Sequence, residues 1–351
     1  MENLIEADLS HILENTKDLW GQVRNKRIFI TGGTGFVGRW LLESFAWANE
    51  KFRLNSVAFI LTRHPERFKK QAGHLASNRA IHLCKGDICS FAFPGGEFEF
   101  IIHAATENKF SSDSLDMYNA NVRGTRRVLD FASSCGNKKF LFTSSGAVYG
   151  KQPSALTNVP ENYLGAPQTT DINSIYGHSK RTSELYCIHY ARKFGIEMKI
   201  ARCFTFLGPF LPLDANYAAG NFIRDALLGG PIYVKNNKRI FRSYLYAADL
   251  AIWLWTILFK GKSCRPYNTG SGKPITVLEL ANKIAGVLKL PNKIKIVKKA
   301  GSAIVERYVP DVHLAENELG LKQTIDLDEG IRRMAKFYSF TLNGKRALQP
   351  K

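Results

Sequence analysis

The sequence lacks the patterns that mark disulfide frameworks, metal sites and membrane anchors. Its six cysteines form no CxxC pair and have no histidine at a metal-ligand spacing, so we expect free thiols and no bound metal. The longest apolar run, residues 250–259, is too short to cross a bilayer and predicts a buried helix instead. Internal repeats and low-complexity segments are also missing. These features exclude a repeat protein and give no reason to expect a membrane partner.

Acidic residues are few compared with basic ones. The chain has 49 Lys and Arg against 30 Asp and Glu, which gives a formal net charge of +19. The basic residues are spread along the chain and form no stripe interleaved with aromatic residues, so nucleic acid is not the expected partner. The first residues are acidic and lack the apolar core of a signal peptide. Together with the unpaired cysteines, this predicts a cytoplasmic protein.

The motif around which the chain is organised lies at residues 26–38. A short apolar run predicts a buried strand, three glycines follow, and the chain continues in an amphipathic helical pattern. The first glycine permits a tight turn, the second lets backbone approach a pyrophosphate, and the third lets the helix pack on the strand. Free N–H groups at the helix start would hold the phosphates. The residues that we assign to cofactor binding here are Gly32, Gly35, Phe36, Val37 and Gly38.

The ends of the next predicted strands carry further candidate cofactor contacts. Arg63 ends the second strand, where an acidic residue would favour NAD. Its planar guanidinium suits a 2′-phosphate, so the sequence favours NADP over NAD, unless Arg63 merely faces water. Asp87 could accept a hydrogen bond from the adenine amino group, with Ile88 packed on the ring. Ala104 and Ala105 end the fourth strand and would let the backbone come close to the cofactor.

Three further residues have the chemistry of proton transfer. Tyr176 and Lys180 lie four apart in a helical pattern, so they project from one face. A tyrosine has an ordinary pKa near 10, and a neighbouring ammonium together with an oxidised nicotinamide is expected to lower it. Ser145 ends the fifth predicted strand and can hydrogen-bond the same substrate oxygen. We therefore predict that these three groups move a proton while hydride is exchanged with a nicotinamide.

The order of elements predicts an α/β fold with a Rossmann-type, doubly wound parallel sheet. Strands and helices alternate from residue 26 to about residue 205, as in sheets covered by helices on both faces. Residues 1–25 are predicted to form a helical extension. The remaining chain alternates short strands with helical patterns, including helices at 248–260, 276–289 and 328–338.

In these motifs the sequence resembles the extended short-chain dehydrogenase/reductase superfamily, in its NAD-dependent epimerase/dehydratase group, which acts on nucleotide sugars. The matching segments run through nearly the whole chain and include TGGTGFVG, YGHSK and RSYLYAAD. They lie at residues 31–38, 86–88, 103–105, 121–125, 143–150, 176–180, 242–249 and 267–270.

The resemblance implies a Rossmann domain and a smaller C-terminal α/β domain that binds a nucleoside diphosphate sugar. The Rossmann domain is expected at 26–205, with residues 238–269 returning to it. The substrate domain is expected at 206–237 and 270–345. The resemblance also implies a homodimer built on two helices.

By the same resemblance, Ser145, Tyr176 and Lys180 fall on the catalytic triad of the family. Its motifs add Asn121 to the cofactor site, beside Tyr176 and Lys180 themselves. Asn221 falls where family members contact the substrate phosphates or sugar. Arg242 matches an arginine that pairs with the diphosphate, and Arg307 is a weaker candidate for the same task.

One departure from the family bears on the reaction. Dehydratases of this family carry acidic residues directly after the catalytic serine or threonine, whereas this chain has Gly146 and Ala147 there. We therefore expect an enzyme that acts at carbon 4 of the sugar, as a 4-epimerase or a 4-ketoreductase. A 4,6-dehydratase that uses acids elsewhere, such as Glu107 or Asp171, is an alternative. A catalytically silent NAD(P)-binding sensor is another.

Overall fold

The structure is a computed structural model of the 351-residue chain, and it describes residues 2–107, 114–215, 217–236, 239–290, 294–298 and 305–346. The strands are β1 Arg27–Thr31, β2 Val57–Thr62, β3 Ile81–Lys85, β4 Phe100–His103, β5 Lys139–Ser145, β6 Glu197–Cys203, β7 Phe206–Leu207, β8 Ile232–Asn236, β9 Arg239–Arg242, β10 Leu245–Tyr246, β11 Arg265–Thr269, β12 Ile275–Thr276, β13 Ile294–Lys298 and β14 Val305–Tyr308. The helices are α1 Glu2–Thr16, α2 Phe36–Lys51, α3 Pro65–Gln71, α4 Gly73–Ala76, α5 Ser114–Ser134, α6 Ile175–Phe194, α7 Ala218–Leu227, α8 Ala247–Lys260, α9 Val277–Val287, α10 His313–Leu319 and α11 Leu327–Arg346. Short 3-10 helices are η1 Trp20–Val23, η2 Gly146–Tyr149 and η3 Ile172–Ser174.

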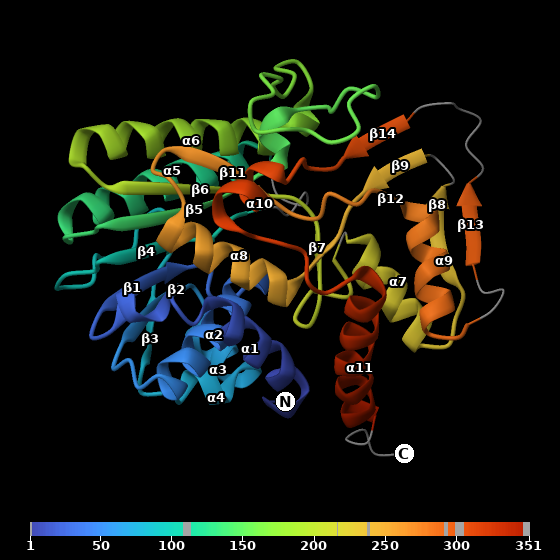
Figure 1. Cartoon of the computed structure of the whole chain (residues 1–351), viewed down its shortest axis with the longest axis horizontal. Coiled ribbons are helices and arrows are strands. Elements are labelled where there is room, and N and C mark those ends of the chain that lie inside the picture. Colours follow the sequence, from blue (N-terminus) through green and yellow to red (C-terminus); the bar gives the residue numbers. More distant parts are fainter. Residues whose placement is uncertain are drawn as a thin grey trace.

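Seven strands form one parallel sheet in the order β11-β6-β5-β4-β1-β2-β3 (Figure 1). Strand β1 lies inside this sheet, between β2 and β4, and its residues Phe29 and Ile30 are fully buried. The strand order reverses after β1, which is the arrangement of the dinucleotide-binding fold. The predicted Rossmann-type sheet is therefore confirmed.

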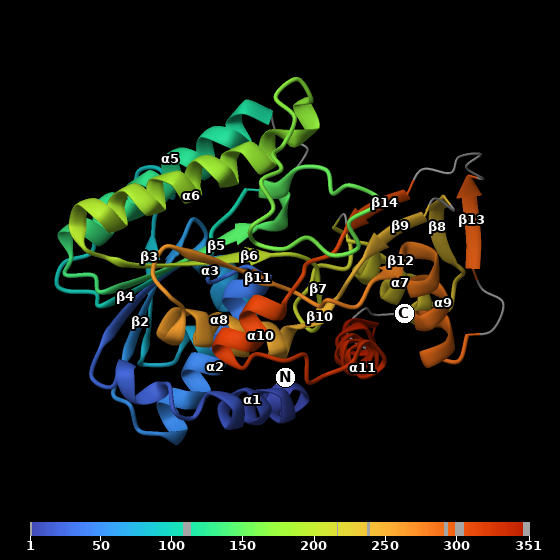
Figure 2. The ribbon, with the colours of Figure 1, turned by 45° about the horizontal axis from the view of Figure 1, so that its top comes forward.

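Helices cover both faces of the sheet, as a parallel sheet requires. Helices α5 and α6 lie on one face, and α1, α2 and α8 lie on the other (Figure 2). Each face has its own core. The cluster around Phe131, Phe140 and Cys187 lies under α5 and α6, and the larger cluster around Trp40 and Trp255 lies under α2 and α8.

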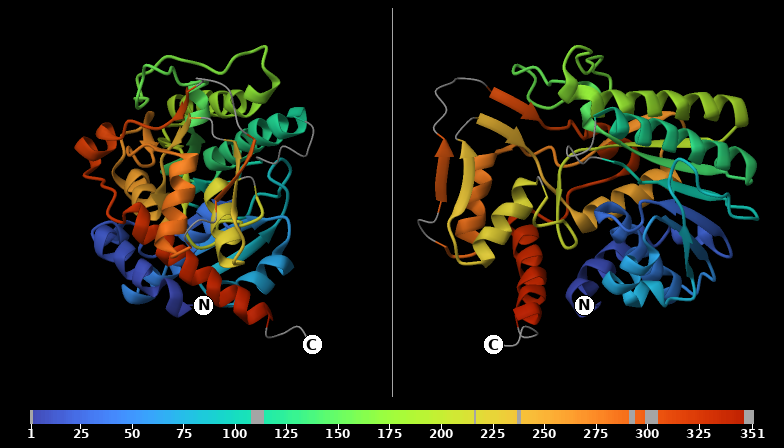
Figure 3. Two further views of the ribbon diagram at one scale, coloured as in Figure 1. Left: turned by 90° about the vertical axis from the view of Figure 1, so that its right-hand side faces the viewer. Right: turned by 180° about the vertical axis from the view of Figure 1, so that it is seen from behind.

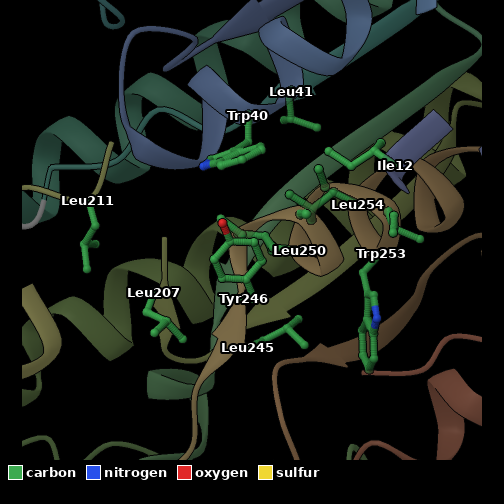
Figure 4. Close-up of a cluster of buried hydrophobic side chains, with 14 of the residues drawn as sticks. Ile12, Trp40, Leu41, Leu207, Leu211, Leu245, Tyr246, Leu250, Trp253 and Leu254 are labelled. Carbon is green, nitrogen blue, oxygen red and sulfur yellow. The ribbon is translucent and has the colours of Figure 1, made fainter. Parts of the chain in front are cut away.

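Helix α8 is the centre of the larger core. It is apolar on all sides because it is buried on all sides, from Ala247 to Phe259. Figure 4 shows Leu250 and Leu254 of this helix beside Trp40 of α2. Full burial of such a side chain contributes about 1.5–3 kcal/mol. The apolar run at residues 250–259 therefore belongs to the core, and no described helix is both long and apolar enough to cross a membrane.

Three small sheets lie beyond the main sheet (Figure 1). They are the parallel pair β7–β10, the three strands β12-β9-β14, and the pair β8–β13. Helix α11 packs against α7 and α9 in this part of the molecule (Figure 3). Strand β11 and helix α8 return to the main sheet. From this arrangement we propose the same domain division that the resemblance implies. The expected boundary between residues 237 and 238 lies outside the described residues.

The turn between β1 and α2 depends on two close backbone approaches. Gly32 has φ +72°, and a Cβ there would lie 2.5 Å from the carbonyl carbon of Ala104. A Cβ on Gly38 would lie 2.2 Å from the carbonyl oxygen of Gly32. Real Cβ atoms do not approach backbone so closely, so both positions require glycine. The first turn of α2 is thereby held directly over the end of β1.

We predict that Gly38→Ala pushes α2 away from the turn and lowers the free energy of unfolding by about 3 kcal/mol, because backbone must move. The matched control is Gly286→Ala in α9, where a Cβ meets nothing within 4 Å. That change should raise the free energy of unfolding by about 0.5–1 kcal/mol, through the entropy of the unfolded chain. Chemical denaturation of both variants checks this. A Gly38→Ala chain as stable as the native one would contradict the packing.

Candidate active site

The carboxyl ends of the parallel strands bring the predicted cofactor residues to one edge of the sheet. Gly32 follows β1 directly, and Gly35 is the residue that caps α2. A Cβ on Gly35 would come no closer than 3.4 Å to another part of the protein. The fold itself does not demand glycine there, whereas the close approach of a pyrophosphate does. Phe36 and Val37 begin α2, where N–H groups lack partners within the helix and attract anions. These residues fit a dinucleotide.

Arg63, Asp87 and Ile88 flank this turn on the side of β2 and β3. Arg63 follows β2, is exposed, and lies 3.7 Å from the carboxylate of Glu107. Asp87 is exposed, and its Oδ1 accepts a hydrogen bond from the backbone N–H of Cys89. Ile88 is half-buried and packs over Gly124 of α5, where a Cβ would lie 2.8 Å from it. Asp87 and Ile88 thus lie at the end of β3 as predicted for adenine contacts.

On the other side of the turn, Ala104 and Ala105 follow β4 and face Gly32 through their backbone. Asn121 is buried in α5, and its side-chain amide is engaged by protein groups. Its Oδ1 accepts from the backbone N–H of Glu107 at 2.9 Å, and its Nδ2 donates to the Glu107 carbonyl at 3.1 Å and to Ser179 Oγ at 3.2 Å. Asn121 therefore fixes the segment after β4, and its part in cofactor binding stays a prediction.

Ser145 and Tyr176 meet at the end of β5. Ser145 is buried, and its Oγ accepts from the backbone N–H of Ala147. Tyr176 lies in the first turn of α6, and its phenol is near enough to Ser145, and to Thr106 of the segment after β4, for both side chains to act on its pKa. Two hydroxyl groups are thereby brought together at the carboxyl edge of the sheet.

Lys180 lies one turn further along α6 and is almost fully buried. Its Nζ donates to the carbonyl of Thr143 at 2.9 Å and lies 5.9 Å from the centre of the Tyr176 ring. Burial lowers the pKa of Lys180 from 10.5 to about 8. The Lys180 ammonium therefore lies near the tyrosine ring and is hydrogen-bonded to β5.

The electrostatics of Tyr176 differ from the expectation. Burial raises the pKa of Tyr176 above its ordinary value of 10, and the hydrogen bonds with Thr106 and Ser145 act in the opposite direction. Lys180 is not among the leading groups that shift this pKa. The physical reason is that its ammonium is directed to the Thr143 carbonyl. In the protein alone, the tyrosine is thus a protonated donor whose activation needs further positive charge.

A second tyrosine, which the sequence did not point to, reaches the same place from the C-terminal part. Tyr308 ends β14, and its hydroxyl lies 3.2 Å from Ser145 Oγ. Its ring packs on Phe204, with ring centres 4.7 Å apart. Arg242 of β9 is paired in register with Tyr308, and its guanidinium lies 5.6 Å from the tyrosine ring centre. Arg242 is thus brought to the face of its small sheet that meets Ser145.

Arg307 lies on the other face of β14, because successive strand residues alternate. It is paired in register with Phe241, and its guanidinium lies 4.3 Å from that ring centre. The structure therefore brings Arg242, but not Arg307, together with Ser145. Among the described residues, Asn221 Oδ1, Ser243 Oγ and Arg307 Nε are buried atoms with no hydrogen-bond partner. Buried polar atoms are normally paired, so these atoms fit a polar ligand.

The two residues after Ser145 cannot supply an acid. A Cβ on Gly146 would lie 2.6 Å from the ring of Phe204, so no larger side chain fits there. Ala147 follows in the short helix η2 and has no titratable group. The departure noted in the sequence is therefore built into the packing of Phe204.

A partly buried ionic network supports the end of β5, and it was not predicted from the sequence. Glu184 of α6 accepts from Ser144 Oγ at 2.5 Å and pairs with Arg202 of β6 through both carboxylate oxygens. Arg202 also donates to the Tyr149 hydroxyl at 2.9 Å. Ser144, Glu184 and Arg202 are far apart in the sequence. The same is true of Ser145 and Tyr308. No local pattern could have found them.

Comparison with known proteins adds three kinds of similarity. The model of the NAD dependent epimerase/dehydratase family matches residues 28–270. UDP-glucuronic acid decarboxylase 3 of Arabidopsis thaliana is 29% identical over 325 residues, which cover 92% of each chain. The UDP-glucose 4-epimerase of Thermotoga maritima superposes with a TM-score of 0.76 at 20% identity, over 90% of this chain and 99% of that one. A dTDP-glucose 4,6-dehydratase of Streptomyces venezuelae superposes with a TM-score of 0.77 at 21% identity, over 92% and 100%.

The depressed pKa of Lys180 predicts a pH-dependent stability. Its folded pKa of about 8 is below the ordinary 10.5, so the buried ammonium costs stability below pH 8, and this cost disappears as pH rises to about 10.5. Relative to Lys180→Met, the native chain should gain about 1.4 kcal/mol per pH unit in this window. Denaturant unfolding of both chains at pH 8 and pH 9.5 measures it. A constant difference would show that Lys180 titrates normally.

Proposed function

The chain belongs to the NAD dependent epimerase/dehydratase family, and we propose that it oxidises or reduces carbon 4 of a nucleoside diphosphate sugar. The reaction is that of a 4-epimerase or a 4-ketoreductase. The observation that carries this proposal is that Ser145 and Tyr176 lie together at the carboxyl edge of the sheet, with the Lys180 ammonium bonded to the carbonyl of Thr143 in β5.

In this proposal Tyr176 exchanges a proton with the hydroxyl on carbon 4 of the sugar. Ser145 Oγ, which accepts from the N–H of Ala147, donates its hydroxyl proton to the same oxygen and so aligns it. The nicotinamide, when bound, supplies the acceptor and donor of hydride and, when oxidised, the positive charge that favours the tyrosinate. Lys180 remains tied to Thr143 and can donate toward the nicotinamide ribose.

The substrate side is proposed to be formed by the C-terminal part. Arg242 is directed to the Ser145 side of β9 and has a planar fork suited to a diphosphate. Asn221 of α7 offers a buried amide oxygen without a protein partner, which suits a sugar hydroxyl as donor. The net charge of +19 also favours an anionic substrate. Arg307 is the least supported of the three residues, since it faces away from Ser145.

The fate of the carbon 4 ketone separates the reactions. A 4-epimerase returns hydride to the other face of a rotated ketone, whereas a 4-ketoreductase releases the cofactor after one transfer. A 4,6-dehydratase must remove and add protons at carbons 5 and 6, and the packing of Phe204 on Gly146 opposes an acid there. Of the other acids considered, Glu107 pairs with Arg63, and Asp171 caps η3 through the N–H of Asn173.

Decarboxylation is a second candidate, favoured by the similarity to UDP-glucuronic acid decarboxylases. Oxidation of a uronic acid at carbon 4 gives a β-keto acid, because carbon 5 carries the carboxylate. Such acids lose carbon dioxide without a further base on the enzyme; the resulting enolate takes up a proton at carbon 5, and hydride then returns to the ketone at carbon 4. Gly146 and Ala147 therefore do not oppose this route, and it uses the same Ser145, Tyr176 and Lys180.

The cofactor is proposed to be NAD or NADP. The family description names NAD, and the expectation of NADP rests on Arg63 alone. A silent sensor that binds the cofactor without turnover is the remaining alternative. Such a protein would not need Ser145 and Tyr176 to lie together at the carboxyl edge of the sheet.

We also propose the homodimer that the resemblance implies, built on α5 and α6. Leu115 of α5 and Leu185 of α6 are 60% and 69% exposed, although the two helices pack together on one face of the sheet. Apolar side chains on an outer helix face are expected where a second copy covers them. Light scattering in solution measures this. A mass equal to the single chain of 39.4 kDa would contradict it.

A panel of UDP- and dTDP-sugars, incubated with NAD and separately with NADPH, tests the proposed function. Isomerisation without net change of the cofactor identifies an epimerase, and stoichiometric consumption of the reduced cofactor on a 4-keto sugar identifies a reductase. Carbon dioxide released from UDP-glucuronic acid identifies a decarboxylase. A product lighter by one water would instead identify a dehydratase.

Tyr176→Phe is the control for that panel. Loss of the hydroxyl should lower turnover at least about a hundredfold, which is the usual scale for a proton-transfer group. Cofactor affinity should change less than about threefold, because the ring remains. Equal turnover of the two chains would remove Tyr176 from the mechanism, and silence of the native chain on every sugar would favour the sensor.

A further inference from the structure

One ion pair spans the carboxyl edge of the sheet above the glycine turn. Arg63 follows β2, and Glu107 lies in the segment after β4, so the pair reaches across the end of β1. Arg63 Nη2 and Glu107 Oε2 are 3.7 Å apart, with side chains 60% and 24% exposed. A dinucleotide lies at this place in the fold, with its adenosine ribose at the end of the second strand. The pair therefore borders the ribose position.

The position of Glu107 is fixed by the protein. Its backbone N–H and carbonyl both bond the side-chain amide of Asn121, which is buried in α5. The same amide oxygen accepts from Thr106 Oγ1 at 3.2 Å. The segment that carries Glu107 is thus held from the interior of the molecule, and its carboxylate is held on the side of Arg63.

We propose that Glu107 is a specificity-determining residue for the cofactor. Its carboxylate competes with a 2′-phosphate for the guanidinium of Arg63 and repels the phosphate charge, whereas a ribose hydroxyl can donate to it. Glu107 thereby supplies, from the segment after β4, the acidic group that is missing at the end of β2. This role depends on the proposed function, since it requires that the chain bind a nicotinamide dinucleotide. With Glu107 beside it, Arg63 does not by itself indicate that the chain prefers NADP.

Other acids near Arg63 do not share this arrangement. Glu66 in α3 pairs with Lys69 at 2.8 Å and is 76% exposed. Asp87 follows β3, and its Oδ1 accepts from the N–H of Cys89. Glu66 is therefore a matched control, because it is an acidic residue three positions from Arg63 that bonds to a different cation.

The experiment measures the dissociation constants of NADH and NADPH by nicotinamide fluorescence, for the native chain and for Glu107→Gln, Arg63→Gln and Glu66→Gln. The amide of Glu107→Gln keeps the shape and the backbone bonds to Asn121 but removes the charge. We expect NADPH to bind about tenfold tighter to Glu107→Gln, with less than about threefold change for NADH. Arg63→Gln should weaken NADPH about tenfold and NADH little. Glu66→Gln should leave the ratio of the two constants within about twofold of the native value.

The outcomes separate this inference from the proposed function. If the native chain binds neither NADH nor NADPH, the proposed function fails. If both bind and the ratio in Glu107→Gln equals the native ratio, the inference fails and the function stands. An equal shift in Glu66→Gln would show a general effect of charge and would also overturn the role of Glu107. A merely structural role of Glu107 would weaken both cofactors alike and leave the ratio unchanged.

Discussion

Burial of the Tyr176 phenol against the end of β5 is the constraint on which the active site depends. Burial raises its pKa, and the hydrogen bonds with Ser145 and Thr106 only partly oppose that effect. The tyrosine is therefore poised as a proton donor that becomes a base when positive charge is brought near. Burial of Lys180 lowers its pKa to about 8, so the two pKa values move apart and burial favours the neutral form of each group. A bound, oxidised nicotinamide would then supply the positive charge that the tyrosinate needs.

The site joins two parts of the fold that the sequence keeps far apart. Strand β5 supplies Ser145 and helix α6 supplies Tyr176, whereas β14 supplies the Tyr308 hydroxyl that touches Ser145. Phe204 packs on Tyr308 and also closes the space at Gly146. One aromatic side chain thus contacts the small sheet that carries Arg242 and leaves no room at Gly146 for an acid.

The features that the sequence predicted correctly depend mainly on interactions between residues that are close together in the chain. The glycine turn was predicted because Gly32 and Gly38 contact each other within the turn, although Gly32 also meets Ala104 from across the sheet. The spacing of Tyr176 and Lys180 required only one helical turn. Three features depend on contacts across the chain and could not be predicted. They are the Tyr308 contact, the direction of Lys180 toward Thr143, and the pairing of Arg63 with Glu107. The position of Arg307 could not be predicted either, because the register of β14 against β9 decides which face of the small sheet its side chain occupies.

The most direct test of proton and hydride exchange at carbon 4 uses a sugar nucleotide that the chain turns over, carrying deuterium at carbon 4. A single turnover with stoichiometric NAD or NADP is stopped by acid, and the mass of the cofactor and sugar is measured. The account predicts that deuterium leaves carbon 4 and is found on the nicotinamide or back on carbon 4 of the product, never in water. Deuterium that is lost to solvent, or that never appears on the nicotinamide at any stopping time while product forms, would contradict it.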